Sequence, residues 1–446
     1  MTTEIAVMNK HAIAMAADSA VTIAVPSSQG KSYKVLNSAN KLFALSKYAP
    51  VGLMIYGNGS LLGVPWESII KIFRRSLGGT EYPSLDDYCS HFFSFLDRFE
   101  VSQEVQDRYV IRGNAEPLFR SIRKELDTWV TAELEAGRVL TELDISNKLD
   151  TLVNQRWEEF DKIKEQSVFT NVERSSLQEK YKEAVEGVAK EVFEKHPLSV
   201  QAQQKLLTIA IVAASVGRKN QSGIVIAGFG SKSLYPSYKS FDVAAVLAGR
   251  TVKRQVDEQA ITDMMGAAIV PFAQSDDVHT FMRGIGPTLN KFLDKTFRTI
   301  MTSNLPEKLV EAAVGRLSLS TVQAQDLRKI AEDMCAGATD AAFGRFAELQ
   351  KIHYIDPVVR ATEFLNKGEL AAMAETLVNL VSFRKQVTME AETVGGPIDV
   401  AVITQGDGFI WIKRKHYFQQ ELNHHFFHNY FRRNVQYGQD EPTQSI

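Results

Sequence analysis

The chain begins with the stretch MTTEIAVMNKHAIAMAADS, residues 1–19, in which two short apolar runs are separated by a polar turn. The runs are residues 5–8 and 12–17, and Asn9-Lys10-His11 lies between them. This pattern predicts a strand, a turn and a second strand. Because consecutive apolar residues are typical of a fully buried strand, we expect this hairpin to lie in a core.

A core hairpin so close to a chain end needs a reason, since terminal residues usually fray. One reason is chemical. If Met1 is removed, as the small side chain of Thr2 permits, Thr2 carries both a hydroxyl and a free α-amino group. The amine can then act as the base that activates the hydroxyl, as in N-terminal threonine nucleophiles. Most chains that begin with Met-Thr have no such activity, so the prediction depends on the residues that accompany Thr2.

The accompanying residues resemble the start of proteasome β subunits and their bacterial peptidase relatives, which are N-terminal nucleophile hydrolases. Members of that family begin with an exposed threonine, continue through a hairpin and reach an Ala-Asp-Ser-like triplet. Ala17-Asp18-Ser19 stands at the same spacing from Thr2. The resemblance extends over residues 2–100, 220–300 and 367–412 and is strongest in the first block.

The resemblance implies one four-layer αββα sandwich of the N-terminal nucleophile hydrolase type, interrupted by two large helical insertions. We assign residues 2–100, 206–302 and 366–446 to the sandwich, and residues 101–205 and 303–365 to the insertions. The first insertion has apolar residues at helical spacing, and a capping box at Ser176 and Glu179 predicts a helix start there. We expect this insertion to be a compact appendage with its own small core.

The resemblance also implies site residues besides Thr2. Asp18 would pair with a lysine that lowers the pKa of the amine, since a like charge disfavours the ammonium form. Residues 26–31 are predicted to form a loop after the apolar run at residues 21–25. Lys34 lies at the ungapped distance, but we prefer Lys41, which directly precedes an apolar run, because the polar Gly30-Lys31-Ser32 loop is a natural place for an insertion. Gly57 matches the glycine whose N–H forms the oxyanion hole.

Two further features follow from the same comparison. Ser275 matches a serine at a strand-to-helix corner, although an ordinary N-cap serine is an equal alternative. The pocket for the residue before the cleaved bond would be apolar and lined by Val21, Ala39, Phe43 and Ile55.

The chain departs from the family just before Gly395-Gly396, where an Asp and a Ser often stand. Here Glu392 is the acidic residue and Thr393 the nearby hydroxyl. The accessory part of the site is therefore altered.

Composition narrows the class of protein. With 51 basic and 53 acidic residues in 446, the chain has no basic excess for nucleic-acid binding. Two cysteines, Cys89 and Cys335, exclude a disulfide framework and suit a reducing cytoplasm. No apolar run reaches membrane-spanning length and no signal peptide is recognisable, so we expect a cytoplasmic protein without membrane contact.

We expect no cofactor and no metal. His424, His425 and His428 are spaced for one helix face, but no His-Glu-x-x-His arrangement is present, and a solvated or subunit-contacting tail is the better interpretation.

The sequence therefore predicts a threonine peptidase that cleaves peptides or unfolded chains within a self-assembling homo-oligomeric ring. An ATPase unfoldase, if one cooperates, is a separate protein, because this chain has no ATPase motif. Two alternatives stay open: a catalytically inactive proteasome-like scaffold, favoured by the missing serine, and a small-molecule amidase on the same fold.

Overall fold

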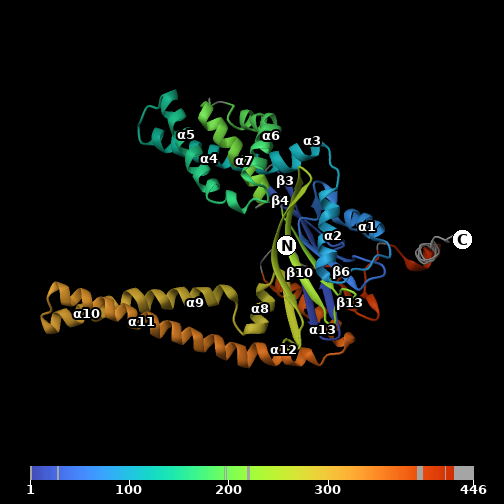
Figure 1. Cartoon of the computed structure of the whole chain (residues 1–446). Helices are drawn as coiled ribbons and strands as arrows, with labels where there is room; N and C mark the ends of the chain where they lie inside the picture. Colours follow the sequence, from blue (N-terminus) through green and yellow to red (C-terminus); the bar gives the residue numbers. More distant parts are fainter. Residues whose placement is uncertain are drawn as a thin grey trace. The chain divides into compact units, whose positions relative to one another are not determined.

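A computed structural model describes residues 3–27, 30–194, 196, 198–217, 221–388, 395–416 and 418–425 (Figure 1). The chain divides into two compact units, and each is described by itself. The first unit consists of Met1–Ala39, Ile261–Val402 and Ile410–Tyr417. The second consists of Asn40–Ala260, Ile403–Phe409 and Phe418–Ile446.

The N-terminal hairpin forms the middle of a five-stranded sheet in the order β12-β1-β2-β13-β14. Its strands are β12 (Ala267–Ala273), β1 (Thr3–Asn9), β2 (Ile13–Ala17), β13 (Asp399–Thr404) and β14 (Gly408–Lys413). β1 pairs antiparallel with β2 through Glu4↔Ala17 and with β12 through Thr3↔Ala273. All residues of β1 and β2 are buried, so the predicted core hairpin is confirmed.

Two helices cover one face of this sheet. α13 (Lys367–Val387) contacts β1, β2 and α8 (Asp276–Arg283). Ile5 and Val7 of β1 share one apolar cluster with Leu370, Val378 and other residues of α13. Strand alternation explains this arrangement, since residues i and i+2 project from the same face.

The rest of the first unit consists of a strand pair and further helices. The strand pair is β3 (Val21–Ser27) and β4 (Gly30–Leu36), so the loop predicted at residues 26–31 is wrong: strand residues occupy all of it except 28 and 29, which are not described. The helices are α9 (Pro287–Thr299), η3 (Ile300–Asn304), α10 (Leu305–Leu317), α11 (Thr321–Gln350), η4 (Lys351–Ile355) and α12 (Asp356–Glu363).

The second unit contains another five-stranded sheet, in the order β11-β10-β9-β6-β5. Its strands are β5 (Leu42–Ala44), β6 (Val51–Gly57), β9 (Ser222–Gly228), β10 (Ser237–Leu247) and β11 (Arg250–Ala260). A small hairpin, β7 (Ser60–Leu61) with β8 (Val64–Pro65), precedes α1 (Trp66–Leu77), and α2 (Leu85–Asp97) contacts β9, β10 and β11. Ser84 caps α2 within a capping box that it forms with Asp87.

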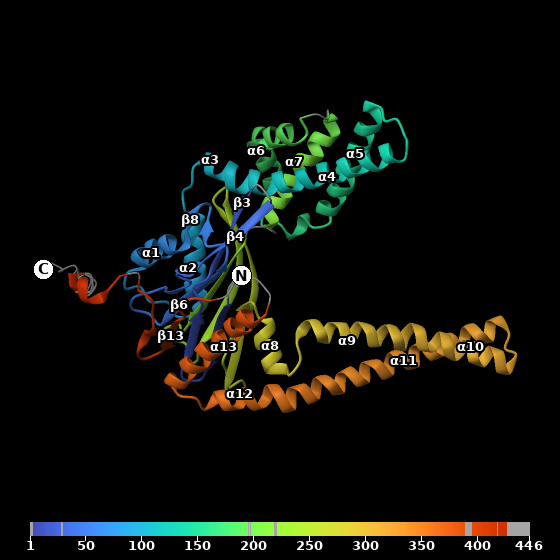
Figure 2. The same cartoon turned by 180° about the vertical axis from the view of Figure 1, so that it is seen from behind.

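The remaining helices of the second unit correspond to the predicted first insertion. They are α3 (Gln103–Gln106), η1 (Asp107–Arg112), α4 (Gly113–Glu135), α5 (Glu142–Asp161), η2 (Lys164–Gln166), α6 (Asn171–Val192) and α7 (Val200–Val216), and a short η5 (Gln420–Leu422) follows near the C-terminus. α4 to α7 pack on one another (Figure 2). The insertion boundary at residue 205 falls inside α7, and the domain limits stay a prediction.

Two detailed expectations for this region are wrong. α6 begins at Asn171, where Thr170 and Glu173 form the capping box, while Ser176 lies inside the helix and bonds to the Val172 carbonyl. The helices also lack a separate core: Phe119 and Tyr181 belong to the same buried cluster as Trp66 and Ile226. The mixed α and β class is confirmed, and the four-layer sandwich stays a prediction.

A substitution at Gly228 tests how closely the backbones of β9 and the segment that enters β6 approach each other. It has φ +144°, and a Cβ atom there would lie 2.0 Å from the Pro50 carbonyl oxygen. Gly228→Ala should therefore lower the free energy of unfolding by about 3 kcal/mol, because backbone must move to admit the methyl group. Urea denaturation measures this cost. Gly79→Ala is the control, since a Cβ there meets nothing within 4 Å; equal stability of the two variants would contradict the packing argument.

Candidate functional site

The site predicted from the sequence begins at Thr2, which lies outside the described residues. The next residue, Thr3, is the first of β1 and is fully buried. Its backbone N–H donates to Asp18 Oδ1 at 3.0 Å, and the Asp18 N–H donates to the Thr3 carbonyl at 3.2 Å. The residue that follows the predicted nucleophile is therefore held at the end of β2.

Asp18 joins three segments of the first unit. Its Oδ2 atom accepts hydrogen bonds from the N–H groups of Ala20 and Gly395, both at 3.1 Å. Only 1% of the residue is exposed. A buried carboxylate is costly unless donors surround it, and backbone N–H groups supply this compensation. Asp18 thus ties the start of β1 to the segment that enters β13.

Ser19 adds to this connection. Its hydroxyl donates to the Pro397 carbonyl, and its N–H donates to the Gly395 carbonyl at 3.2 Å. The Ser19 carbonyl accepts from the Ala39 N–H at 3.1 Å. The sequence analysis identified Gly395 only by its place in the resemblance, and its direct bonds with Asp18 and Ser19 could not be predicted from sequence spacing. Glu392 and Thr393, the altered accessory residues, lie outside the described residues.

Ser275 stands at the same edge of the sheet as Thr3. Thr3 pairs with Ala273, the last residue of β12, and Ser275 follows two positions later. Ser275 occupies the N-cap position of α8, but its side chain makes no capping hydrogen bond. The ordinary N-cap alternative therefore describes the position of Ser275 but not the bonding of its side chain. One turn later, burial and the nearby Arg283 cation lower the pKa of His279.

Sequence reasoning missed two buried polar side chains in β1. Glu4 has no exposed surface, although its neighbours across the sheet are Ala17 and Phe272. Thr3 Oγ1 is also buried and has no hydrogen-bond partner within the described part of the chain. The sequence contained a sign of this burial, because Glu4 directly precedes an apolar run. Since Glu4 is near a chain end, however, we would expect its side chain to be exposed.

The lysine candidates differ in burial. Lys41 precedes β5 and is 3% exposed, and its carbonyl accepts from the Ile55 N–H at 2.9 Å. Lys34 is exposed on β4, opposite Ile23. A buried lysine needs a compensating partner, whereas an exposed one is solvated. Burial thus agrees with the preference for Lys41, whose catalytic role stays a prediction.

Gly57, the predicted oxyanion-hole residue, ends β6 with φ +76°. A Cβ atom there would lie 2.8 Å from the Gln221 carbonyl oxygen, so both conformation and space require glycine. A position that only glycine can occupy often brings the backbone close to a ligand, and the predicted role of Gly57 is of this kind.

The four predicted pocket residues divide between the units. Val21 and Ala39 are half-buried in the first unit. Phe43 and Ile55 are buried in the second unit, where both belong to its core cluster. The structure therefore groups Asp18, Ser275, Val21 and Ala39 in one unit, and Lys41, Gly57, Phe43 and Ile55 in the other.

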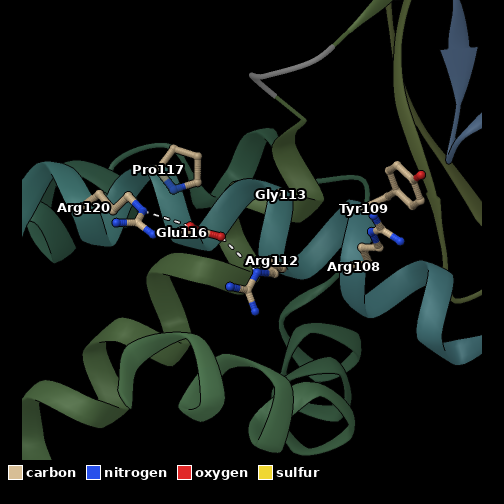
Figure 3. A pocket seen from close by; sticks show the side chains of 7 residues that line it. All are labelled: Arg108, Tyr109, Arg112, Gly113, Glu116, Pro117 and Arg120. Atoms are coloured by element: carbon tan, nitrogen blue, oxygen red, sulfur yellow. Dashed lines mark hydrogen bonds and ion pairs between the residues drawn. The ribbon is translucent and has the colours of Figure 1, made fainter. Parts of the chain in front are cut away.

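A shallow depression of about 400 Å³ lies elsewhere, on η1 and α4 of the second unit (Figure 3). Glu116 accepts from Arg112 at 3.0 Å and from Arg120 at 2.7 Å, and Arg112 also pairs with Glu191. The Arg108 guanidinium lies 5.5 Å from the Tyr109 ring centre. These pairs neutralise most of the local charge, so we assign the depression no chemistry.

Comparison with known proteins adds little to the evidence for the fold and the candidate site. No family model matches the chain, and no curated protein matches it. Among solved structures, Anbu (ancestral beta-subunit) from Yersinia bercovieri is similar over 97% of each chain, with 9% sequence identity and a TM-score of 0.25. A TM-score of this size is too low to establish a common fold.

Two general features complete the description. Within the described ranges, no helix is both long and apolar enough to cross a membrane. The described residues also contain no group of three His, Cys, Asp or Glu side chains placed to hold a metal ion. His424 and His425 are among them, whereas His428 is not.

Asp18→Asn should weaken the junction that Asp18 forms. The amide retains one acceptor oxygen and directs an NH₂ group at backbone N–H donors, so we expect a loss of about 2–3 kcal/mol in the free energy of unfolding. Thermal and urea denaturation measure it. Asp333→Asn is the matched control, because Asp333 is exposed. Two variants as stable as the wild type would show that the Asp18 junction contributes little.

Proposed function

We propose that this protein is a threonine-type N-terminal nucleophile hydrolase that cleaves peptide bonds within a homo-oligomeric ring of αββα subunits. The observation that carries the proposal is the bond from the Thr3 N–H to the buried carboxylate of Asp18. The sequence interpretation required an aspartate beside the start of the chain, and this bond supports that requirement one residue from Thr2.

In the proposed reaction, Thr2 is the first residue of the mature chain. Its Oγ attacks the carbonyl carbon of the substrate's peptide bond. At the same time its α-amino group takes the proton of the Thr2 hydroxyl, directly or through a water molecule. The α-ammonium then gives its proton to the nitrogen of the scissile bond, the C–N bond breaks, and the amine product leaves behind an acyl-enzyme ester. The α-amino group next takes a proton from a water molecule that attacks the ester, and the acid is released as the proton returns to Thr2 Oγ. An α-amino pKa near 8 suits a base at neutral pH.

The other predicted residues would assist this reaction. Asp18 would orient the lysine, and Lys41 would lower the pKa of the amine by its like charge. The Gly57 N–H would stabilise the oxyanion, a contribution of roughly 3 kcal/mol for one donor. The Ser275 hydroxyl would lie near the α-amino group of Thr2, as the serine at this corner does in the family. A pocket lined by Val21, Ala39, Phe43 and Ile55 would favour apolar or aromatic side chains over charged ones.

The first test concerns the nucleophile. Wild-type protein that lacks Met1 should gain the mass of one electrophilic peptide probe, and Thr2→Ala should gain none and lose peptide cleavage. Intact-mass spectrometry reads both the N-terminus and the label, and an unchanged melting temperature controls for folding. Active protein that retains Met1 would disprove the mechanism, because the amine would then be an amide.

The second test concerns the lysine. Lys41→Ala should lower kcat/KM at pH 7 by about tenfold through protonation alone, because an amine with its usual pKa near 8 is then about nine-tenths protonated, and further because Asp18 loses its partner. Lys34→Ala should retain most activity, since Lys34 is exposed. Rates measured between pH 7 and 10 add a signature: the activity of Lys41→Ala should recover as the pH rises. The reverse order of the two variants would assign the role to Lys34.

Failure of both tests would favour the inactive scaffold. The residues before Gly395, where Glu392 and Thr393 replace the family's Asp and Ser, are the observation that keeps this alternative. A folded ring that no probe labels would establish it, whereas turnover of small amides but not peptides would indicate an amidase.

A further inference from the structure

An exposed turn, residues 57–59, ends β6 in the second unit. It begins with Gly57, whose N–H would stabilise the oxyanion in the proposed function. Glycine has more conformational freedom than any other residue, so a glycine N–H keeps one direction only where the surrounding chain fixes it. The value of Gly57 as a hydrogen-bond donor therefore depends on what holds this turn.

The hydrogen bonds of neighbouring residues show on which side of β6 the Gly57 N–H lies. The Ile55 N–H donates to the Lys41 carbonyl at 2.9 Å, on the side of β5. The Asn58 N–H donates to the Gln221 carbonyl at 3.2 Å, on the side of β9. Because successive N–H groups of a strand alternate between its two sides, the Gly57 N–H shares the side of Ile55. The pairing of β5 with β6 ends before Gly57, and among the described residues this N–H has no hydrogen-bond acceptor.

Asn58, the middle residue of the turn, is anchored at both of its backbone polar groups. Its N–H bond to Gln221 is one anchor, and its carbonyl accepts from the Ser222 hydroxyl at 2.7 Å. Ser222 is the first residue of β9 and stands directly opposite Gly57 in the register between β6 and β9. Only 1% of Ser222 is exposed, whereas Asn58 is exposed. A buried hydroxyl thus holds the residue that follows Gly57.

A third residue fixes the direction of the Ser222 hydroxyl. The Trp66 indole Nε1–H donates to Ser222 Oγ at 2.8 Å, and Trp66 has no exposed surface. An indole N–H can only donate and a carbonyl can only accept. Ser222 must therefore accept from Trp66 and donate to Asn58, so its one hydrogen is committed to the turn. The Trp66 backbone N–H also donates to the Gly59 carbonyl at 3.1 Å, which ties the end of the turn to the start of α1.

We propose that Ser222 is a positioning residue for the oxyanion site, through a relay of two hydrogen bonds from the Trp66 indole to Ser222 Oγ and from Ser222 Oγ to the Asn58 carbonyl. The anchors on Asn58 hold Gly57 at φ +76°, so its N–H keeps one direction before the substrate binds. A donor fixed in advance stabilises the developing charge without reorganisation. This inference rests on the proposed function, because it assigns Ser222 to the oxyanion site of that reaction.

The two bonds of Ser222 can be separated by substitution. Trp66→Phe removes the indole N–H but leaves the Ser222 hydroxyl able to donate to Asn58. Ser222→Ala removes both bonds and leaves the buried indole N–H without an acceptor, which lowers stability. If the relay serves the turn, turnover follows the bond to Asn58, whereas stability also follows the indole.

Steady-state kinetics on a short peptide test this in the full-length protein without Met1. Ser222→Ala should lower kcat about tenfold or more and change KM less than about twofold, because the Gly57 N–H acts on the transition state rather than on the bound substrate. The pH profile should keep its wild-type shape, unlike that of Lys41→Ala, since no titrating group changes. Trp66→Phe should lower the melting temperature but keep kcat within about threefold of the wild type.

The double variant Ser222→Ala with Trp66→Phe completes the comparison. Its kcat should be as low as that of Ser222→Ala. Its loss of stability should be smaller than the sum of the two single losses, because no buried indole N–H is left unpaired. If Ser222→Ala alone does not fold, the double variant measured against Trp66→Phe gives the same comparison of kcat.

Ser215→Ala is the matched control, because Ser215 is also a fully buried serine of the second unit, and its hydroxyl bonds to the Val212 carbonyl within α7. It should keep the wild-type kcat. Wild-type kcat in Ser222→Ala would overturn the inference and leave the proposed function intact. So would losses of kcat that simply follow the melting temperature across the variants. A wild type that neither cleaves peptide nor takes up the electrophilic probe would overturn both, and the absent probe label distinguishes that failure.

Discussion

The burial of the Asp18 carboxylate is the constraint on which the N-terminal part of the structure depends. A charge with almost no exposed surface is stable only where donors converge on it, and here the backbone of Thr3, Ala20 and Gly395 provides them. Thr3 and Ala20 are near Asp18 in sequence, but Gly395 is 377 positions away and must meet them for these bonds to form together. The position of the chain start thus follows from the solvation of one carboxylate.

The sequence predicted elements wherever side-chain burial dominates. The apolar runs of β1, β2, β6 and β9 and the capped helix α2 could be recognised because burial leaves a clear pattern. β11 could not, since its middle residues are exposed and, apart from Val256, charged or polar. The strand Arg250–Ala260 forms because its backbone pairs with the hydrogen-bonding edge of β10. A local sequence pattern does not encode such pairing.

For the candidate site, the sequence predicted individual residues better than the contacts between them. Asp18 was identified by spacing, and its hydrogen bonds agree with that choice. The partner segment at Gly395 depends on contacts across more than 370 residues, so no periodicity could reveal it. The sequence offered both Lys41 and Lys34 and preferred Lys41 because it directly precedes an apolar run, and the burial of Lys41 agrees with this preference. The predicted start of α6 was wrong because several hydroxyl residues near it could each serve as the N-cap.

The register of β1 has a consequence for synthesis of the chain. β1 leaves the ribosome long before β12, with which one of its edges pairs: Asn9 meets Ala267, which lies 258 positions later in the chain. At roughly 5–20 residues per second, that edge stays open for tens of seconds. Such high contact order slows folding, and an apolar strand with open hydrogen-bonding groups is prone to aggregate. Nascent chains of this protein thus present the kind of segment that chaperones protect.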